Sequence, residues 1–167
     1  ADLEWCVISS GGTLLELAKE NSKPYIEIPS GLQPRAAFGL MTKAVASFTP
    51  ESFGVNIVEN CNDAGFYINK LLDNESENEI IKRSKEIANN IGNKTVIIYA
   101  GTKLSYLASQ RWKTQINENA KSKSYVGYMP EVHHNEILSW EADTDGSKNN
   151  FHLVFLRDQN EHPKIKN

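Results

Sequence analysis

The sequence has little cysteine, no long apolar run and no recognisable signal peptide. Its 167 residues include Cys6 and Cys61 as the two cysteines, and two isolated cysteines provide no disulfide framework. We expect reduced thiols in a cytoplasmic protein, with Cys6 buried in its apolar surroundings. No apolar run approaches the ~18 residues that a membrane-spanning helix requires, so we expect no membrane partner.

The sequence also lacks a cluster of one charge sign. The formal net charge is -3, and no block of Lys or Arg would attract nucleic acid or an anionic membrane surface. We therefore expect neither as a partner, although a few local donors would suffice to bind one anionic metabolite. Apolar residues make up 40% of the chain, which is typical of a globular protein with a core.

An initiating methionine is absent as well. The chain starts at Ala1 and soon enters the apolar run Trp5–Ile8, so we expect a buried strand over 4–9 and a chain that begins within a longer protein. A turn over 9–12, a helical apolar face and a second strand over 25–28 follow. A strand, helix and strand in this order predict a parallel βαβ unit.

The remainder of the chain alternates in the same way. Pro34 is expected in the first turn of a helix, and Gly92 is expected to end another. Predicted helices cover residues 35–48, 63–72, 79–91 and 103–121, and predicted strands cover 95–100 and 151–156. The polar run 73–78 is expected to connect two subdomains. This pattern predicts an α/β fold with three layers, in which parallel sheets are flanked by helices and ligands bind at the carboxyl ends of the strands.

The predicted helix over 103–121 carries a candidate general base. Its apolar residues share one face, which we expect to be core: Leu104, Ala108, Trp112 and Ile116. Arg111, Gln115 and Glu118 form a neighbouring polar stripe. Partial desolvation beside the apolar face would raise the pKa of Glu118 and make it a base near neutral pH. The spacing alone fits a solvated or Arg-paired surface carboxylate better.

Two histidines and two carboxylates lie close together between Glu131 and Glu136. Such a cluster suggests a metal site, but the spacing of His133 and His134 matches neither the helical His-Glu-x-x-His pattern nor a Cys/His cluster. Histidines that make structural hydrogen bonds are the more common explanation, and we expect no metal.

Two further features could bind an anion. The Ser-Ser-Gly-Gly turn over 9–12 could present backbone N–H groups to a phosphate at a helix N-terminus, although such turns are common without a ligand. Arg35 stands at the expected start of a helix, where a cation opposes the helix dipole. This placement hints at an anionic partner, while a surface ion pair is the ordinary alternative.

Longer motifs carry a resemblance to a known family. The run Arg111–Lys121 resembles the signature of the archaeal and bacterial bifunctional phosphoglucose/phosphomannose isomerases. Pro130-Glu131 followed by His134-Asn135-Glu136-Ile137 resembles their second motif. Residues 8–12 and 34–39 resemble earlier segments in the same order. The matches span nearly the whole chain.

The resemblance implies a fold and a domain plan. The family has two sugar-isomerase (SIS) domains, each a parallel sheet between helices. Residues 1–33 would then be the end of the first SIS domain, 34–79 interdomain helices and linker, and 80–167 an incomplete second SIS domain. The upstream Ser/Thr loops that hold the phosphate, and a C-terminal lysine expected to assist ring opening, would both lie outside this chain.

The resemblance also implies an activity and residue roles. Family members interconvert glucose 6-phosphate, mannose 6-phosphate and fructose 6-phosphate without metal or cofactor, and they work as homodimers. By motif match, Glu118 carries the proton between C2 and C1, His134 opens the sugar ring, and Arg35 stabilises the enediolate. One local departure is His133, which stands where the family has Asn.

Two alternative functions follow from neighbouring families. SIS domains also occur in regulators that bind sugar phosphates without turning them over, and such a sensor would need no base at Glu118. Metal-dependent mannose-phosphate isomerases resemble β-rich cupins, which the alternation of helices and strands opposes.

Overall fold

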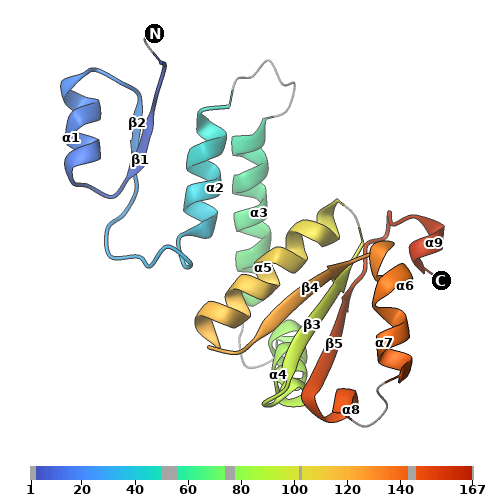
Figure 1. The fold of residues 1–167 in the computed structure, drawn as a ribbon. Coiled ribbons are helices and arrows are strands. Elements are labelled where there is room, and N and C mark those ends of the chain that lie inside the picture. The colour runs from blue at the N-terminus through green and yellow to red at the C-terminus, as the bar shows by residue number, and fades with distance from the viewer. Residues whose placement is uncertain (1–2, 50–55, 74–77, 102, 143–145, 167) are drawn as a thin grey trace. The chain divides into compact units, whose positions relative to one another are not determined.

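A computed structural model describes residues 3–49, 56–73, 78–101, 103–142 and 146–166 (Figure 1). The chain divides into two compact units, residues 1–80 and 81–167. The polar run 73–78, predicted to join two subdomains, falls near this division, and its residues 74–77 lie outside the described part. Each unit is an α/β structure with parallel strands, so the predicted fold class is confirmed.

The first unit begins with the predicted βαβ arrangement. Strands β1 (Val7–Ser9) and β2 (Tyr25–Glu27) pair in parallel, and α1 (Thr13–Glu20) connects them. Leu15 and Ala18 are the buried residues of α1. The prediction that Cys6 is buried is wrong, since Cys6 precedes β1 and is exposed.

Two helices complete the first unit, α2 (Phe38–Ser47) and α3 (Ile57–Leu72). Helix α2 starts later than predicted because the residues after Pro34 form a separate turn, in which the Ala36 N–H donates to the Gln33 carbonyl at 2.8 Å. Helix α3 starts earlier than predicted because the Asn56 side chain accepts from the Glu59 N–H at 3.1 Å and caps the helix. The α3 surface is unusually apolar, with Phe66 74% exposed.

The second unit is built on a three-stranded parallel sheet in the order β4-β3-β5. The central strand β3 (Thr95–Ala100) and β5 (Phe151–Leu156) have the predicted bounds, whereas β4 (Ser124–Tyr128) was not predicted. The other elements are helices: α4 (Glu79–Ile91), α5 (Leu104–Asn119), α6 (Glu131–Asn135), α7 (Ile137–Ala142), α8 (Gly146–Asn150) and α9 (Pro163–Lys166). Gly92, with φ of 54°, follows α4 and ends it as predicted.

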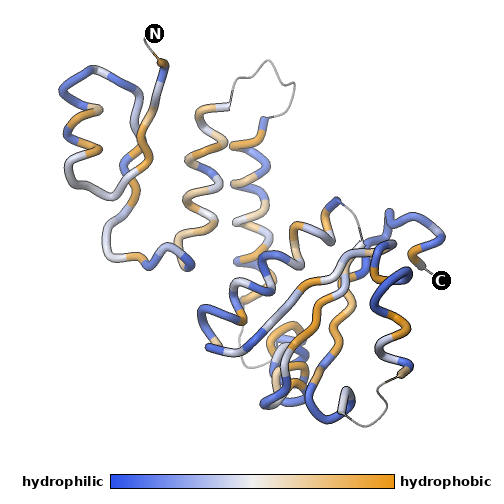
Figure 2. Tube along the Cα trace, viewed as in Figure 1, coloured by the Kyte–Doolittle hydropathy of each residue, from blue (hydrophilic) through white to orange (hydrophobic). Residues whose placement is uncertain are grey.

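Helices cover both faces of this sheet (Figure 1). Strands β3 and β5 are both largely apolar (Figure 2). Successive side chains of the central strand β3 point to opposite faces of the sheet. Tyr99 packs against Val132 of α6 and Trp140 near the end of α7. Val96 and Ile98 point to the other face, where α5 lies, and both are fully buried. Two connections that start from neighbouring strands thus cover opposite faces and form three layers.

The predicted core face of α5 is wrong by about one residue. Ser105 and Ser109 are its buried residues, whereas Leu104 is 69% exposed. Small side chains occupy this buried face, and the turn that leads into it is also tight: a Cβ placed at Gly101, between β3 and α5, would lie 3.4 Å from the Ser105 hydroxyl. Close approach favours the small polar residues over the leucine, which periodicity alone placed inside.

Candidate active site

Glu118 lies in the last turn of α5, and its side chain is exposed. The Ser122 N–H donates to the Ile116 carbonyl and bends the chain from this turn toward β4. The expected partial desolvation is absent, because the buried residues of α5 are near its other end. On the same polar stripe, the Gln115 carboxamide lies between the Arg111 guanidinium and the Asn119 carboxamide.

His134 lies in the short helix α6, which follows β4. His133 and His134 are both exposed, while Val132 of the same helix is buried. The Asn135 carboxamide donates to Glu131 Oε1 at 3.1 Å and braces the helix along its outer side. The imidazole of His134 is therefore accessible to a ligand.

The structure does not bring Glu118 and His134 of one chain together. Glu118 precedes the amino end of β4, and His134 follows the carboxyl end of the same strand. Five residues of parallel strand separate these ends, which corresponds to roughly 13 Å from Ser124 to Tyr128. The two predicted residues thus lie at opposite ends of the strands in the second unit, Glu118 at the amino ends and His134 at the carboxyl ends.

The remaining predicted residues belong to the first unit. Arg35 is half-buried and lies in the turn before α2, not at the helix start, so the argument from the helix dipole does not apply to it. In the Ser-Ser-Gly-Gly turn, the Ser9 hydroxyl donates to the Gly11 carbonyl at 2.7 Å and accepts from the Gly11 N–H at 3.3 Å. Gly12 has φ of 78°, a conformation that favours glycine. These contacts give the turn a structural role of its own.

A crevice of about 500 Å³ opens beside the carboxyl end of β5, next to the start of α5. Ser105, Phe155 and Asn160 are among its lining residues. Open parallel sheets usually bind their ligands at the carboxyl ends of the strands, where this crevice lies. None of the three residues predicted as the site, Arg35, Glu118 and His134, lines it.

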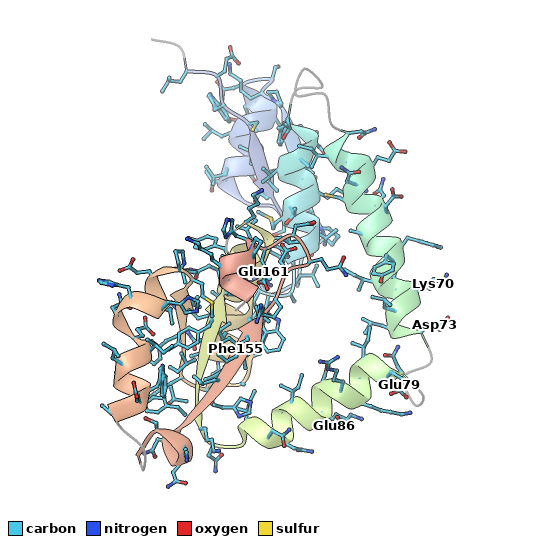
Figure 3. All side chains as sticks on the ribbon, turned by 90° about the vertical axis from the view of Figure 1, so that its right-hand side faces the viewer. Lys70, Asp73, Glu79, Glu86, Phe155 and Glu161 are labelled. Atoms are coloured by element: carbon cyan, nitrogen blue, oxygen red, sulfur yellow. The ribbon has the colours of Figure 1, made fainter. Side chains whose placement is uncertain are left out.

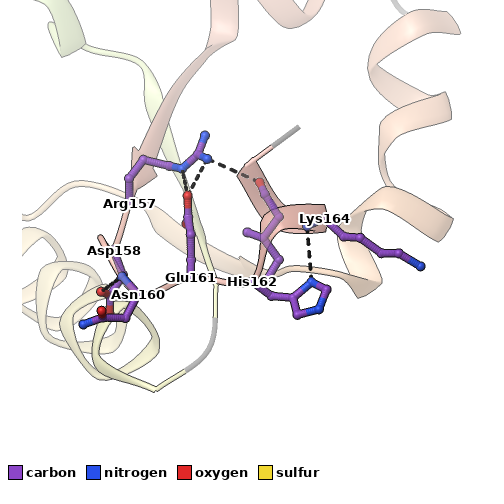
Figure 4. A network of polar contacts seen from close by, with 7 residues as sticks. Arg157, Asp158, Asn160, Glu161, His162 and Lys164 are labelled. Carbon is purple, nitrogen blue, oxygen red and sulfur yellow. Dashed lines mark hydrogen bonds and ion pairs between the residues drawn. The ribbon is translucent and has the colours of Figure 1, made fainter.

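An ion pair follows β5 at this crevice (Figure 4). Arg157 Nε donates to Glu161 Oε1 at 2.7 Å, and Arg157 Nη2 donates to the Ile165 carbonyl at 3.4 Å. The hydrogen bond that Arg157 donates to the Glu161 carboxylate raises the pKa of Arg157 above its ordinary value. The side chain of Glu161 is 3% exposed, so the pair fastens the segment before α9 to the end of the sheet.

A hydrogen-bonded network next to His134 was missed from the sequence. The Tyr99 hydroxyl donates to Glu136 Oε2 at 2.8 Å and accepts from Trp140 Nε1 at 2.6 Å. Burial, together with the neighbouring Glu136 carboxylate, raises the pKa of Tyr99 to about 12. Separations of 37 and 41 residues along the chain hide these partners from any local pattern.

The part of the chain that the structure describes has neither a cluster of metal-ligating side chains nor a helix suited to span a membrane. In that part of the chain, no three His, Cys, Asp or Glu side chains gather closely enough to hold a metal ion. Its helices are also too short or too polar for any of them to cross a membrane.

Comparison with known proteins identifies the family. Residues 80–167 match the family described as the bacterial phospho-glucose isomerase C-terminal SIS domain. The chain belongs to this family. The predicted resemblance and the SIS fold are thereby confirmed, and the family is one of sugar-phosphate isomerases.

Individual relatives of this SIS family extend the similarity to almost the whole chain. The chain is 34% identical to a bifunctional phosphoglucose/phosphomannose isomerase of Aquifex aeolicus over 95% of the chain and 46% of that relative. It is 32% identical to the enzyme of the same name from Caldicellulosiruptor bescii over 94% of the chain and 47% of the relative. A D-glucosamine-6-phosphate 4-epimerase of Sulfolobus acidocaldarius is 33% identical over 80% of the chain and 41% of the relative. The chain spans about half the length of the curated relatives it matches. No solved structure matches it.

Proposed function

We propose that the protein containing this chain interconverts glucose 6-phosphate and mannose 6-phosphate with fructose 6-phosphate, without a metal or cofactor. The observation that carries the proposal is the similarity to the Aquifex enzyme over 95% of the chain, which includes the run Arg111–Lys121. The protein would act on small sugar phosphates in the cytoplasm. Its domains would be divided as the resemblance implies, with 1–33 ending a first SIS domain and 34–79 joining it to the second at 80–167.

Each proposed residue has a chemical task. His134 assists opening of the sugar ring by moving a proton at the ring oxygen. Glu118 removes the proton from C2 of the open aldose, and the electron pair forms a cis-enediolate. The hydroxyl proton moves from O2 to O1, and the same carboxyl group then returns its proton to C1, which leaves the carbonyl at C2 and gives the ketose. Because both C2 epimers lose their proton to the same enediolate, one base would serve both sugars.

The enediolate carries negative charge, and a fixed cation lowers the energy of such an intermediate. Arg35 is the residue proposed for this task by motif match. Its half-buried position in an ordered turn supports a fixed orientation of the guanidinium. Glu118 remains available as an accessible carboxylate, and a proton transfer of this kind contributes typically 10²- to 10⁴-fold to rate.

The position of the two catalytic candidates supports a homodimer. Glu118 and His134 of one chain lie beyond opposite ends of β4, too far apart to act on one sugar. A two-fold symmetric pair of chains would bring Glu118 of one subunit to His134 of the other. Exposed apolar side chains on the helices of the first unit, such as Val45 at 57% and Ile68 at 52%, are consistent with burial against further protein surface.

The test is a coupled assay for fructose 6-phosphate formed from glucose 6-phosphate and from mannose 6-phosphate, with a chelator present. It uses the encoded protein, together with any sequence that flanks these 167 residues. Activity on both sugars that falls roughly 10²- to 10⁴-fold in Glu118→Gln supports the proposal. Binding of both sugar phosphates without turnover would contradict it and favour the sensor.

A second candidate reaction is epimerisation at C4 of an amino-sugar phosphate. The relative from Sulfolobus acidocaldarius bears that activity in its name. Glucosamine 6-phosphate is therefore included as a substrate, and the product is analysed by NMR. Conversion to the C4 epimer without formation of fructose 6-phosphate from glucose 6-phosphate would replace the proposed isomerisation by this reaction.

A further inference from the structure

The short helix that carries His134 is attached to the sheet on both sides of the histidine. Before it, the Met129 N–H donates to the Ala100 carbonyl at 2.9 Å, which extends the pairing of β4 with β3. Val132 is 4% exposed and packs in the core. After it, Glu136 places a carboxylate oxygen 2.8 Å from the hydroxyl of Tyr99, a residue of β3.

Tyr99 is held in one orientation by its surroundings. It is 3% exposed, and its ring lies 5.6 Å from the ring of Phe155 on β5, which Figure 3 labels. Gly127 on β4 leaves room for the ring, because a Cβ there would come within 2.6 Å of it. The hydroxyl uses its one hydrogen on Glu136 and accepts from Trp140. Donor and acceptor roles are thus assigned throughout the network.

The geometry of the helix fixes the direction in which the His134 side chain points. Val132 and Glu136 are four residues apart, so both side chains point to the face that touches the sheet. His134 lies midway between them, about 200° around the helix axis from Val132. The two anchored side chains therefore direct His134 away from the sheet.

We propose that Tyr99, acting through Glu136, positions His134 for the ring-opening step. This inference rests on the proposed function, in which His134 moves the proton at the ring oxygen. A helix of five residues has little stability of its own, whereas a proton donor must stay within hydrogen-bond reach of its target. The link from the buried phenol to Glu136 supplies the constraint that α6 alone lacks.

The test compares Tyr99→Phe and His134→Ala, singly and together, in the encoded protein with glucose 6-phosphate as substrate. Tyr99→Phe keeps the ring and removes the hydroxyl. We expect kcat to fall about threefold to tenfold with KM nearly unchanged. In the His134→Ala background, the same change should cause no further fall. The matched control is Tyr128→Phe, which removes a hydroxyl that accepts from Gln110, and it should leave kcat unchanged.

A second readout follows His134 without requiring activity. In the NMR spectrum of the histidine C2 protons, Tyr99→Phe should shift the His134 signal and leave that of His162, near α9, in place. An unshifted His134 signal, or an equal loss of kcat with and without His134, would overturn the inference while leaving the isomerase intact. Full activity of His134→Ala would instead refute the ring-opening role in the proposed function. In that case, a shift of the His134 signal in Tyr99→Phe would still show that Tyr99 positions His134.

Discussion

The ring of Tyr99 lies directly over Gly127, on the adjacent strand, at a distance that excludes any larger side chain. A Cβ at Gly127 would lie 2.6 Å from Tyr99 Cε1 and 2.8 Å from Val132 Cγ2. Neither neighbour can withdraw easily, because both are buried in one cluster with Met129. Glycine at this position is therefore a packing requirement of the sheet and of the helix that carries His134.

Gly127→Ala should destabilise the protein by about 1–3 kcal/mol, as expected for an extra methyl group in a packed core. The free energy of unfolding in urea measures the effect. The control is Gly65→Ala, since Gly65 lies in α3 with no atom within 4 Å of the added Cβ. That change should leave stability unchanged or raise it by about 0.5–1 kcal/mol. Equal stability of Gly127→Ala and the wild type would contradict the close packing.

Tyr99 also predicts how stability depends on pH. Its pKa is about 12 in the native protein, compared with 10.0 for an ordinary tyrosine. As pH rises above 10, the unfolded chain loses this proton first, so ionisation stabilises the unfolded state. The contribution is fully present below pH 10 and is lost as pH rises toward 12, with a slope of at most about 1.4 kcal/mol per pH unit.

The measurement is the difference in unfolding free energy between wild type and Tyr99→Phe from pH 8 to 11. This difference removes the titration of the other tyrosines and lysines. This difference should be constant up to about pH 10. Above that pH, the unfolding free energy of the wild type should fall relative to that of Tyr99→Phe. A difference that stays flat through pH 11 would show that Tyr99 is not held in its neutral form.

Arg157 and Glu161 provide a prediction about the carboxyl end of the sheet. Arg157→Met should lower Tm, because the nearly buried Glu161 carboxylate, 3% exposed, would lose the guanidinium that compensates its charge. Adding Glu161→Gln to that variant should restore part of the Tm, since a neutral amide is less costly to bury. Equal Tm values for the single and double variants would show that the charge of Glu161 is compensated elsewhere.

The predicted and observed folds differ most where packing outweighs local pattern. Strands β3 and β5 consist largely of β-branched and aromatic residues, and their bounds follow from sequence. Strand β4 was missed because Ser124 and Gly127 weaken its pattern, yet Gly127 is there to accommodate the Tyr99 ring. The buried face of α5 was misplaced because Ser105 and Ser109 lie inside through close approach to the sheet.

The candidate site shows the same division. Glu118 and His134 could be named from motifs that resemble a family, since a motif is local. Their separation depends on β4, which the sequence pattern did not predict. Their placement at opposite ends of that strand could therefore not be foreseen. The Tyr99–Glu136 contact joins residues 37 positions apart, and it required the three-dimensional fold.

The separation of Glu118 and His134 makes a prediction about subunit exchange. If each site takes Glu118 from one chain and His134 from the other, then Glu118→Gln and His134→Ala variants should each have strongly reduced activity alone yet complement one another. Random association of equal amounts places about half of the dimers in mixed form, and one of the two sites in each mixed dimer holds both intact residues. Co-expression should thus restore about a quarter of the wild-type activity. The double variant Glu118→Gln/His134→Ala, co-expressed with Glu118→Gln, is the control and should restore none. Verified mixed dimers without recovered activity would place both residues in a site belonging to one chain, or remove one of them from catalysis.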